Sequence, residues 1–481
     1  MRTRWRLAVS LGLGAILLLS CGFRARDRNV FAGTNPQSIP VATFYDPDGV
    51  VGDNFGYSVA LSGDGSTVLI GADGTSESGM SDVGKAYIYT RSNDAWATNP
   101  IATFVDPALQ QSDAFGGILA LSWDGNTALV GSNSGVVYIY NRSNGSWTAS
   151  PSAVLSDPSS GNSGLLGDFF GSSIAVSGDG TTALVGASGA SANGISQAGK
   201  AYIFTEVNGI WSQAPEAVFA EPGPVTDDRF GNYVALSVND TVALIGTASL
   251  WNPGRAFIFT KVNGIWNTTP VATVDLPGNS NEIFSSGALS ANGELALIGS
   301  TGVDGGLGAV YVYTGKNGAW LTAASAVFND PPGQNGFGLN VALSGNGDIA
   351  AIPDLSMYFY AQRDGSWLTQ SVTVLSAEPP AANFCGGYEF QSIALSFDGS
   401  EALIGEPEMP WGTINPPPPP GCVNGAVGRA YIYVSSDGWM NPSPAPSPTT
   451  NSGGSSGGGA ISLFSLMLLV TLLTWSKHFQ H

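Results

Sequence analysis

Residues 55–71 read FGYSVALSGDGSTVLIG, and residues 85–89 read KAYIY. Short apolar runs alternate here with Gly, Asp and Ser, which is the pattern of strands joined by tight turns rather than of helices. Asp64-Gly65 stands between the first two runs, where a hairpin turn requires positive backbone angles. We therefore expect three consecutive antiparallel strands in this stretch.

The same unit recurs seven times: Phe-Gly, a first strand, a turn, an Ala-Leu-Ile-Gly strand, a loop, a Gly-x-Ala-Tyr-Ile-Tyr strand, and Gly-x-Trp. The second strands are 68–71, 128–131, 183–186, 243–246, 296–299, 350–353 and 402–405. The third strands centre on Tyr87, Tyr138, Tyr202, Phe257, Tyr311, Tyr358 and Tyr431. The tryptophans are Trp96, Trp147, Trp211, Trp266, Trp320, Trp367 and Trp439. Short strands repeated at this period predict an all-β chain that folds as a seven-bladed β-propeller.

A fourth strand follows each tryptophan, as in residues 101–104 (IATF) before Asp106-Pro107. A copy of it, residues 41–44 (VATF), stands ahead of the first unit, whereas no such run follows Trp439. We expect residues 41–44 to be the outer strand of the last blade, which closes the ring and removes its open edges. The propeller is then expected to span residues 40–440.

The predicted turns and loops separate onto two faces of the disc. Tight Asp-Gly turns join the first two strands, and Asn-Gly turns such as Asn144-Gly145 join the third and fourth. The long loops, between the second and third strands and before each Phe-Gly, fall on the opposite face. Binding residues are common on loops that a rigid scaffold positions. We therefore expect ligand contacts on the face of the long loops.

The units resemble FG-GAP repeats, the blade motif of integrin α-subunit propellers and of many bacterial surface proteins. Phe-Gly itself stands at Phe55-Gly56, Phe115-Gly116, Phe170-Gly171, Phe230-Gly231 and Phe337-Gly338. Units five and seven depart from it, with Phe284-Ser285 and Phe390-Gln391. Integrin-type blades bind calcium through an Asp-x-Asp-x-Asp-Gly loop, and this chain has only half of one, Asp46-Pro47-Asp48-Gly49. Calcium as a cofactor therefore stays an open expectation.

The charge balance bears on the partner. The chain has 17 Lys and Arg against 36 Asp and Glu, a formal net charge of −19. Such a surface repels a phosphate backbone, so we expect no nucleic-acid partner. It suits cations, a basic protein or a neutral glycan, and it also favours solubility outside the cell.

The N-terminal end resembles an export signal. Arg2, Arg4 and Arg6 precede an apolar run at residues 7–19, followed by Ser20 and Cys21, so residues 1–20 are expected to be a signal peptide. Residues 18–21 (LLSC) also resemble a bacterial lipobox, in which the Cys21 thiol is acylated. An unmodified thiol in an ordinary signal peptide is the alternative. Residues 21–39 are expected to form a linker.

The C-terminal end changes composition. Residues 441–459 are rich in Pro, Ser and Gly, which indicates a linker. Residues 460–481 resemble a glycine-glycine C-terminal sorting tail, although Lys477 stands where such tails carry an arginine cluster. A permanent membrane anchor and a GPI-type signal are the alternatives. Each of these three interpretations predicts an exported protein. It is expected at an outer membrane or the cell surface, or released outside the cell.

Few residues suited to catalysis are present. The only histidines, His478 and His481, lie beyond the apolar tail, which excludes a Ser-His or Cys-His nucleophile and a histidine-bound metal from the body. Carboxylates are abundant, but their spacing selects no pair. We expect no enzyme, with a polysaccharide-acting enzyme that uses carboxylates alone as the rival.

A set of aspartates stands two residues before the Phe-Gly position. The set is Asp53, Asp113, Asp168 and Asp228, with Asn281 and Asn335 at the aligned places of units five and six. In a closed ring these residues are expected around the mouth of the central channel. Their oxygens could bind a cation or sugar hydroxyls. The simpler hypothesis is that each caps the turn that enters its strand.

Two tryptophans and two cysteines fall in the long loops. Trp251 and Trp411 match no repeat position, so we expect them to contact ligand. The seven repeated tryptophans are instead expected to pack the blades. Cys385 and Cys422 lie in two loops of the last unit on one face, which predicts a disulfide in an oxidising compartment, with free thiols as the alternative.

The combined expectation is a binding or adhesion module, exported to the cell surface, that recognises a protein or glycan through its long loops. A structural component of a surface assembly is a third hypothesis. The sequence names no ligand.

Overall fold

The computed structural model describes residues 39–50, 52–158, 167–249, 253–276, 283–303, 307–330, 336–354, 356–376, 391–407, 428–435 and 439. All regular secondary structure in these ranges is β, as predicted. Within them, no helix is long and apolar enough to cross a membrane. The two ends, with the predicted signal peptide, Cys21, both linkers and the sorting tail, lie outside the described residues.

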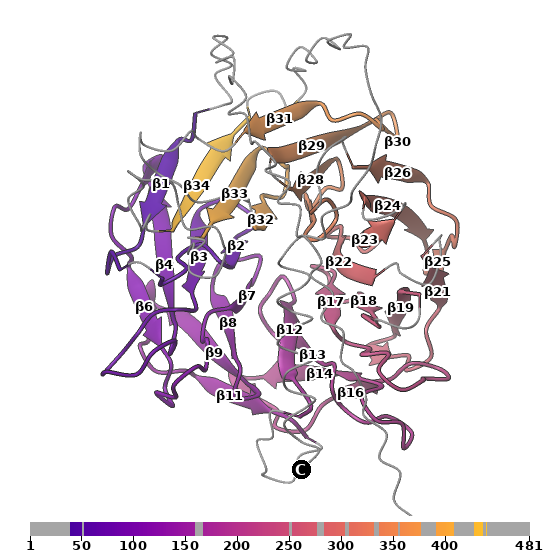
Figure 1. Cartoon of the computed structure of the whole chain (residues 1–481), viewed down its shortest axis with the longest axis horizontal. Coiled ribbons are helices and arrows are strands. Elements are labelled where there is room, and N and C mark those ends of the chain that lie inside the picture. The colour runs from indigo at the N-terminus through magenta and orange to yellow at the C-terminus, as the bar shows by residue number, and fades with distance from the viewer. Residues whose placement is uncertain are drawn as a thin grey trace, which may run out of the picture. The chain divides into compact units, whose positions relative to one another are not determined.

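Seven antiparallel sheets form the blades, numbered here in chain order (Figure 1). The inner strands are β2 (Val59–Leu61), β7 (Ile118–Leu121), β12 (Phe170–Val176), β17 (Tyr233–Leu236), β22 (Ile283–Leu289), β27 (Ala342–Leu343) and β32 (Ser392–Leu395). The second strands are β3 (Thr67–Ala72), β8 (Thr127–Ser132), β13 (Thr182–Ala187), β18 (Val242–Gly246), β23 (Leu295–Val303), β28 (Ile349–Pro353) and β33 (Glu401–Glu406). The third strands are β4 (Lys85–Ser92), β9 (Val136–Ser143), β14 (Lys200–Val207), β19 (Arg255–Val262), β24 (Leu307–Lys316), β29 (Ser356–Arg363) and β34 (Arg429–Val434).

Each third strand of blades 1 to 6 pairs with two further strands. The outer strands are β6 (Ala102–Val105), β11 (Ala153–Ser156), β16 (Ala217–Phe219), β21 (Ala272–Asp275), β26 (Ala326–Asn329) and β31 (Thr373–Ser376). The others are two-residue strands that end in the repeated tryptophan: β5 (Ala95–Trp96), β10 (Ser146–Trp147), β15 (Ile210–Trp211), β20 (Ile265–Trp266), β25 (Ala319–Trp320) and β30 (Ser366–Trp367). These short strands add a fifth strand to the four predicted per blade.

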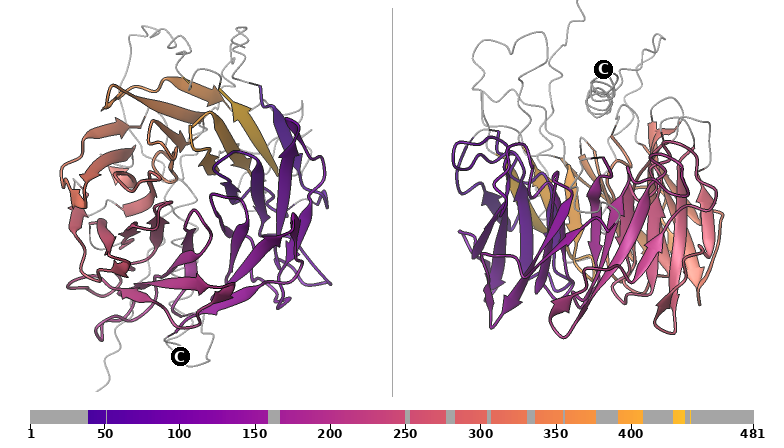
Figure 2. Two further views of the ribbon diagram at one scale, coloured as in Figure 1. Left: turned by 180° about the vertical axis from the view of Figure 1, so that it is seen from behind. Right: turned by 90° about the horizontal axis from the view of Figure 1, so that it is seen from below.

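The N-terminal strand closes the ring, which confirms the predicted role of residues 41–44. Strand β1 (Ala42–Tyr45) pairs antiparallel with β34 of blade 7, with Phe44 opposite Ala430. Each inner strand contacts the next one along the chain, and β32 contacts β2. The blades therefore form a closed circle, which Figures 1 and 2 show face-on and edge-on.

The core lies between the blades. Seven clusters of buried apolar side chains occupy the seven interfaces between neighbouring blades, one cluster each. Phe44 from β1 is only 3% exposed and packs against Tyr89 and Trp96 of blade 1. The repeated tryptophans pack in these interfaces, as in the edge-on contacts of Trp147 with Phe104 and of Trp266 with Phe219.

The glycines of the repeat allow neighbouring blades to approach closely. A Cβ added to Gly71, at the end of a second strand, would lie 2.0 Å from the carbonyl oxygen of Gly116 in the next blade. Gly116 itself has a φ of +90°, and a Cβ added to it would meet the Lys85 carbonyl oxygen. Glycine is therefore required at both positions because the two backbones touch there. Gly116 is also required because its conformation is left-handed.

A buried serine organises the hairpin between the first and second strands of every blade. In blade 1, the Ser62 hydroxyl donates to Asp64 Oδ1 at 2.7 Å and accepts the Thr67 N–H at 2.9 Å. The equivalent serines, each at most 3% exposed, are Ser122, Ser177, Ser237, Ser290, Ser344 and Ser396. Each donates to the Asp or Asn two residues later and accepts the N–H five residues later. The side chain thereby satisfies a backbone donor that the turn would leave unpaired.

Ser62→Ala is expected to lower the free energy of unfolding by about 1–3 kcal/mol, because the buried Thr67 N–H loses its side-chain acceptor. Ser66→Ala is the control, since its hydroxyl bonds the same Asp64 carboxylate at the exposed tip. Urea unfolding should show a loss below about 0.5 kcal/mol for the control. Equal losses would mean that the hydroxyl of Ser62 does not support the turn.

Candidate functional site

The two faces of the propeller differ in the length of their connections. On one, the hairpin face, the first and second strands are joined by five residues in every blade: 62–66, 122–126, 177–181, 237–241, 290–294, 344–348 and 396–400. On the other, the loop face, the second-to-third connections run from two residues, 354–355, to twenty-two, 407–428. The segments that lead from each outer strand to the next blade, here called connectors, lie on the loop face as well.

The hairpin face is tied together around the ring. Each hairpin between first and second strands makes a backbone hydrogen bond of 2.8–3.2 Å to the hairpin of the next blade. The Gly63 N–H of blade 1 donates to the Trp123 carbonyl of blade 2, and the Phe397 N–H of blade 7 donates to the Gly63 carbonyl, which completes the circle. Trp123 of blade 2 also contacts Phe397 of blade 7 at a ring-centroid distance of 5.7 Å. A Cβ added to Gly345 of blade 6 would lie 2.7 Å from the Trp123 ring. The indole of blade 2 therefore reaches residues of blades 6 and 7 across the ring on this face.

On the loop face, the long loops of blades 1 and 3 are held by the next blade. The carbonyls of Ser81, Asp82 and Val83 accept the N–H groups of Ser112, Ala114 and Phe115. In blade 3, the carbonyls of Ser196, Gln197 and Ala198 accept N–H groups of the connector that enters blade 4. These two loops are thus positioned by a short parallel ladder between blades.

The predicted aspartates lie between blades. Asp53, Asp113 and Asp228 are 4%, 3% and 1% exposed, and Asp168 is half-buried. Their backbone carbonyls accept N–H groups from the residues after the second strands, as in the bond from Gly74 to Asp53. The Asp113 carboxylate accepts the Ser134 N–H at 2.5 Å, and that of Asp228 accepts the Val225 N–H at 2.7 Å. The Asp228 bond lies in the turn that enters its own strand, as the capping hypothesis describes, whereas the Asp113 bond reaches the connection after β8. Ligand binding by these aspartates stays a prediction.

Each of three buried aspartates meets an acidic residue that follows the preceding outer strand. Asp46 faces Asp53, Asp106 faces Asp113, and Glu221 faces Asp228. At the entry to blade 4, the Arg255 guanidinium lies against both acids, since it contacts Glu221 and lies 3.2 Å from Asp228 Oδ2. The two members of each pair stand seven residues apart in the sequence, and this recurring spacing is the signal that could have found them.

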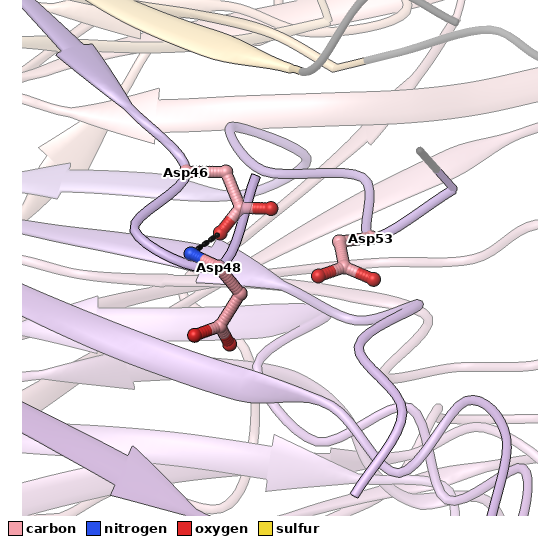
Figure 3. A group of neighbouring side chains, drawn as sticks. All are labelled: Asp46, Asp48 and Asp53. Atoms are coloured by element: carbon pink, nitrogen blue, oxygen red, sulfur yellow. Dashed lines mark hydrogen bonds between the residues drawn. The ribbon is translucent and has the colours of Figure 1, made fainter. Parts of the chain in front are cut away.

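The first pair is extended by a third carboxylate, Asp48 (Figure 3). The carboxylate oxygens of Asp46, Asp48 and Asp53 include a set that lies within 4.8 Å of one another. Asp46 accepts the N–H groups of Asp48 at 2.9 Å and Val50 at 3.3 Å. Burial, followed by the neighbouring charges of Asp46 and Asp48, raises the pKa of Asp53 to about 7.

Asp48 also contacts the third strand of blade 1. Its Oδ2 accepts the Lys85 ammonium at 2.8 Å and the Tyr87 hydroxyl at 3.2 Å. Lys85 lies 3.0 Å from Glu77 as well. The site therefore joins β1, the first connector and β4.

A fourth acidic pair, Asp330 and Asp354, lies at the entry to blade 6, and its pKa shift predicts that stability depends on pH. Burial, and then the charge of Asp354, raises the pKa of Asp330 to about 6 from its ordinary value of 3.8. The folded state therefore holds a proton that the unfolded state has released between about pH 4 and pH 6. Its stabilising effect is present below pH 4 and is lost as the pH rises through 6. Melting curves of Asp330→Asn should show a flatter pH dependence than those of the wild-type chain, and an unchanged slope would exclude this pair as the cause.

Several predicted site residues lie outside the described residues. They are Trp251, Trp411, Cys385, Cys422, Asn281 and Asn335. The ligand-contact role of the two tryptophans and the disulfide therefore stay predictions.

The loop face also exposes large apolar side chains that the sequence did not single out. Leu109, Val225 and Leu339 are 38%, 45% and 46% exposed, each on a different connector. Val50, Tyr57 and Phe169 are further examples. Exposed apolar groups beside loops are common contacts for a protein or sugar partner. No repeat position marks them as a set, so only the structure brings them into view.

Comparisons with known proteins agree with this architecture. Residues 40–89 and 160–204 match the FG-GAP repeat family, and these segments contain strands of blades 1 and 3. The β-propeller domain of Cps50 (Swd1) from Myceliophteria thermophila superposes with a TM-score of 0.51 at 12% identity, covering 82% of this chain and 100% of that domain. At this identity the likeness shows the fold alone. No curated protein matches the chain.

Proposed function

Because the chain carries FG-GAP repeats and folds as a seven-bladed β-propeller, we propose that it is a binding module of the cell surface or extracellular space. Its loop face recognises a protein or a glycan. Export follows from the signal-like N-terminus, and attachment follows from one or both ends of the chain.

The observation that carries this proposal is the difference between the faces. Five-residue hairpins repeat in all seven blades on the hairpin face, whereas the loop face has connections of two to twenty-two residues. Uniform turns are what closing a ring requires, whereas connections of varied length on a rigid scaffold are typical of binding surfaces.

The chemistry of the loop face suits recognition. Leu109, Val225 and Leu339 offer apolar contact area, and the net charge of −19 favours a basic or neutral partner over a polyanion. The acidic pairs are poorly placed for attack on a polymer, since Asp106, Asp113, Glu221 and Asp228 are at most 3% exposed. This burial favours binding over the rival, an enzyme that uses carboxylates alone.

The test is a screen of the full-length chain, purified in mild detergent, against arrays of glycans and of extracellular proteins. We expect saturable binding to one class with no change in the ligand. Turnover of a glycan would replace the proposal with the enzyme, and self-association at micromolar concentration without any ligand would replace it with a structural role.

A further inference from the structure

We propose that the hairpin face rests on the surface of the lipid bilayer to which the chain is attached, and that apolar side chains of blades 3 and 4 enter that surface. The inference rests on the membrane attachment proposed above, and it adds which face of the propeller meets lipid. The loop face then points away from the bilayer, toward a partner.

A second set of hairpins lies on the hairpin face. In blades 1 to 6 it joins each third strand to the two-residue strand that ends in the repeated tryptophan. The Glu206 N–H donates to the Thr181 carbonyl at 2.7 Å, and the Lys261 N–H donates to the Thr241 carbonyl at 2.8 Å. Both carbonyls belong to the five-residue hairpins of blades 3 and 4, so the second hairpins lie beside these on the same face.

Blades 3 and 4 carry large apolar side chains at the tips of their second hairpins. Val207 pairs with Ile210 in blade 3, and Val262 pairs with Ile265 in blade 4. The isoleucines are 74% and 71% exposed, and the valines are 65% and 52% exposed. These four side chains are called here the apolar tips. The inner strands of the two blades contact each other, so the tips stand on neighbouring blades.

The same two positions are small or polar in the other four blades. They are Ser92 and Ala95, Ser143 and Ser146, Lys316 and Ala319, and Arg363 and Ser366. The hairpin itself therefore does not require apolar tips, because four blades form it without them. Single exposed apolar residues need no explanation, whereas a group of them marks a contact with a protein or a membrane.

Both ends of the described chain reach the hairpin face at blade 7. Strand β34 runs toward this face, and β1 is antiparallel to it, so the chain enters β1 from the hairpin side. The Trp439 indole N–H donates to the Gly399 carbonyl in the five-residue hairpin of the same blade. Ile39 and Val41, which lead into β1, are 62% and 60% exposed.

The chain beyond these ends favours lipid as the occupant of the face. Cys21, in the lipobox-like stretch, precedes the predicted linker at residues 21–39, and the apolar run at residues 460–475 follows the predicted linker at residues 441–459. Attachment through either end tethers the hairpin face to the bilayer. A tether raises the effective concentration of the tethered surface, so weak contacts of the face with lipid become significant.

The apolar tips complement the tether. Blades 3 and 4 lie across the ring from blade 7, where both ends of the described chain are found (Figure 1). A tether at one side alone would let the disc tilt on the membrane. Apolar side chains that enter lipid at the opposite side hold the whole face against it, because valine and isoleucine are more stable in apolar surroundings than in water.

The charges of the face indicate which lipid it meets. Asp64, Asp124, Asp179 and Asp398 are exposed on the five-residue hairpins, and the net charge of the chain is −19. Such a surface is repelled by anionic headgroups. A zwitterionic lipid, phosphatidylcholine, is therefore the probe.

The experiment uses the full-length chain in phosphatidylcholine nanodiscs, with the photo-crosslinking residue p-benzoylphenylalanine in place of Ile210 or Ile265. The matched control carries the crosslinker in place of Leu109, which is 38% exposed on the loop face. We expect lipid adducts after illumination to be at least about tenfold more abundant at the two isoleucine positions than at the control position.

A second measurement tests whether the native apolar tips hold the face on lipid. The crosslinker replaces Leu321, which is 60% exposed, and whose N–H donates to the Thr314 carbonyl near the hairpin end of β24. Ile210→Ser combined with Ile265→Ser should lower the lipid adduct at this position by at least about tenfold. Leu109→Ser combined with Val225→Ser, two exposed side chains of the loop face, should leave it unchanged.

Four results would overturn the proposal. They are lipid adducts as abundant at the Leu109 position as at the Ile210 position, adducts of the Ile210 position to a second copy of the chain, an unchanged adduct in the serine double variant of the tips, and a chain that does not stay with the nanodisc. The array screen measures partner binding by the loop face separately, so a failure here is distinguishable from a failure of the proposed function.

Discussion

Replacing Phe44 by alanine is expected to lower the free energy of unfolding by about 3–5 kcal/mol. Phe44 is the buried residue of β1, and its ring lies 4.8 Å from that of Tyr89 and 5.4 Å from that of Trp96. The change removes an aromatic group from the interface between blades 7 and 1. It therefore weakens the contact that closes the circle, and urea unfolding measures the loss.

Tyr45→Ala is the control for this prediction. Tyr45 follows Phe44 in the same strand, points to the other face of the sheet and is 59% exposed. We expect its removal to cost less than about 1 kcal/mol, although it lies under the Arg429 guanidinium. If both substitutions were equally mild, β1 would not be holding the ring closed.

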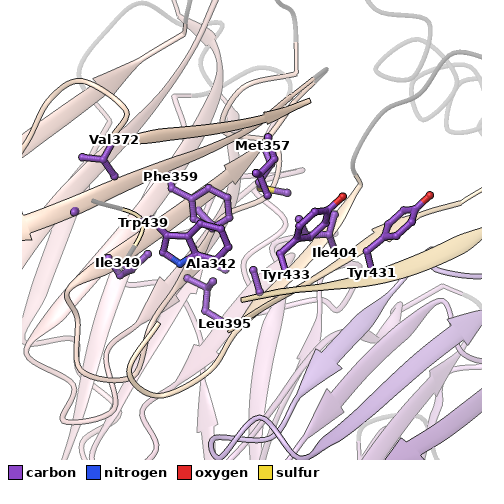
Figure 4. Close-up of a cluster of buried hydrophobic side chains, with 14 residues drawn as sticks. Ala342, Ile349, Met357, Phe359, Val372, Leu395, Ile404, Tyr431, Tyr433 and Trp439 are labelled. Carbon is purple, nitrogen blue, oxygen red and sulfur yellow. The ribbon is translucent and has the colours of Figure 1, made fainter. Parts of the chain in front are cut away.

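Trp439→Ala is the second large effect, with an expected loss of about 3–5 kcal/mol. Trp439 is fully buried and stacks on Phe359 of blade 6 at a centroid distance of 4.0 Å (Figure 4). Its indole N–H donates to the Gly399 carbonyl at 2.6 Å, and its own carbonyl accepts the Thr373 hydroxyl at 2.7 Å. The substitution leaves a cavity beside Phe359, and the Gly399 carbonyl loses its donor in the same interface.

Trp367→Ala is the matched comparison, since Trp367 holds the same repeat position in blade 6. It is partly exposed, packs edge-on against Phe328, and its indole N–H has no partner among the described residues. We expect a loss of about 1–2 kcal/mol by thermal or urea unfolding. A larger loss for Trp367 than for Trp439 would contradict the assigned packing of the last blade.

The fold could be predicted closely because its signals are local and repeated. The predicted second strand at residues 68–71 lies within Thr67–Ala72, and the Asp-Gly turns have glycines with positive φ, such as +67° at Gly65. Closure by the N-terminal strand followed from a count of strand copies. The two-residue strands at the tryptophans were missed, because two residues carry no periodicity.

The site could be predicted only in part, because burial and ion pairing depend on how one blade meets the next. The repeat marked Asp53, Asp113 and Asp228, but it did not show that their side chains are buried. The contacts of Lys85 and Tyr87 with Asp48 join residues that are 37 and 39 positions apart, which no local pattern predicts. The contact of Trp123 with Phe397 likewise follows from the closed ring.

Variants of the two faces test whether the loop face binds the partner. The affinity for the partner found in the screen is compared among wild type, a loop-face variant (Leu109→Ser, Val225→Ser, Leu339→Ser) and a hairpin-face variant (Ile210→Ser, Ile265→Ser). All five side chains are exposed, the last two at 74% and 71%, so neither variant should disturb the fold. We predict that the loop-face variant weakens binding by at least about tenfold and that the hairpin-face variant leaves it unchanged. Weaker binding by the hairpin-face variant with unchanged binding by the loop-face variant would instead place the partner on the hairpin face.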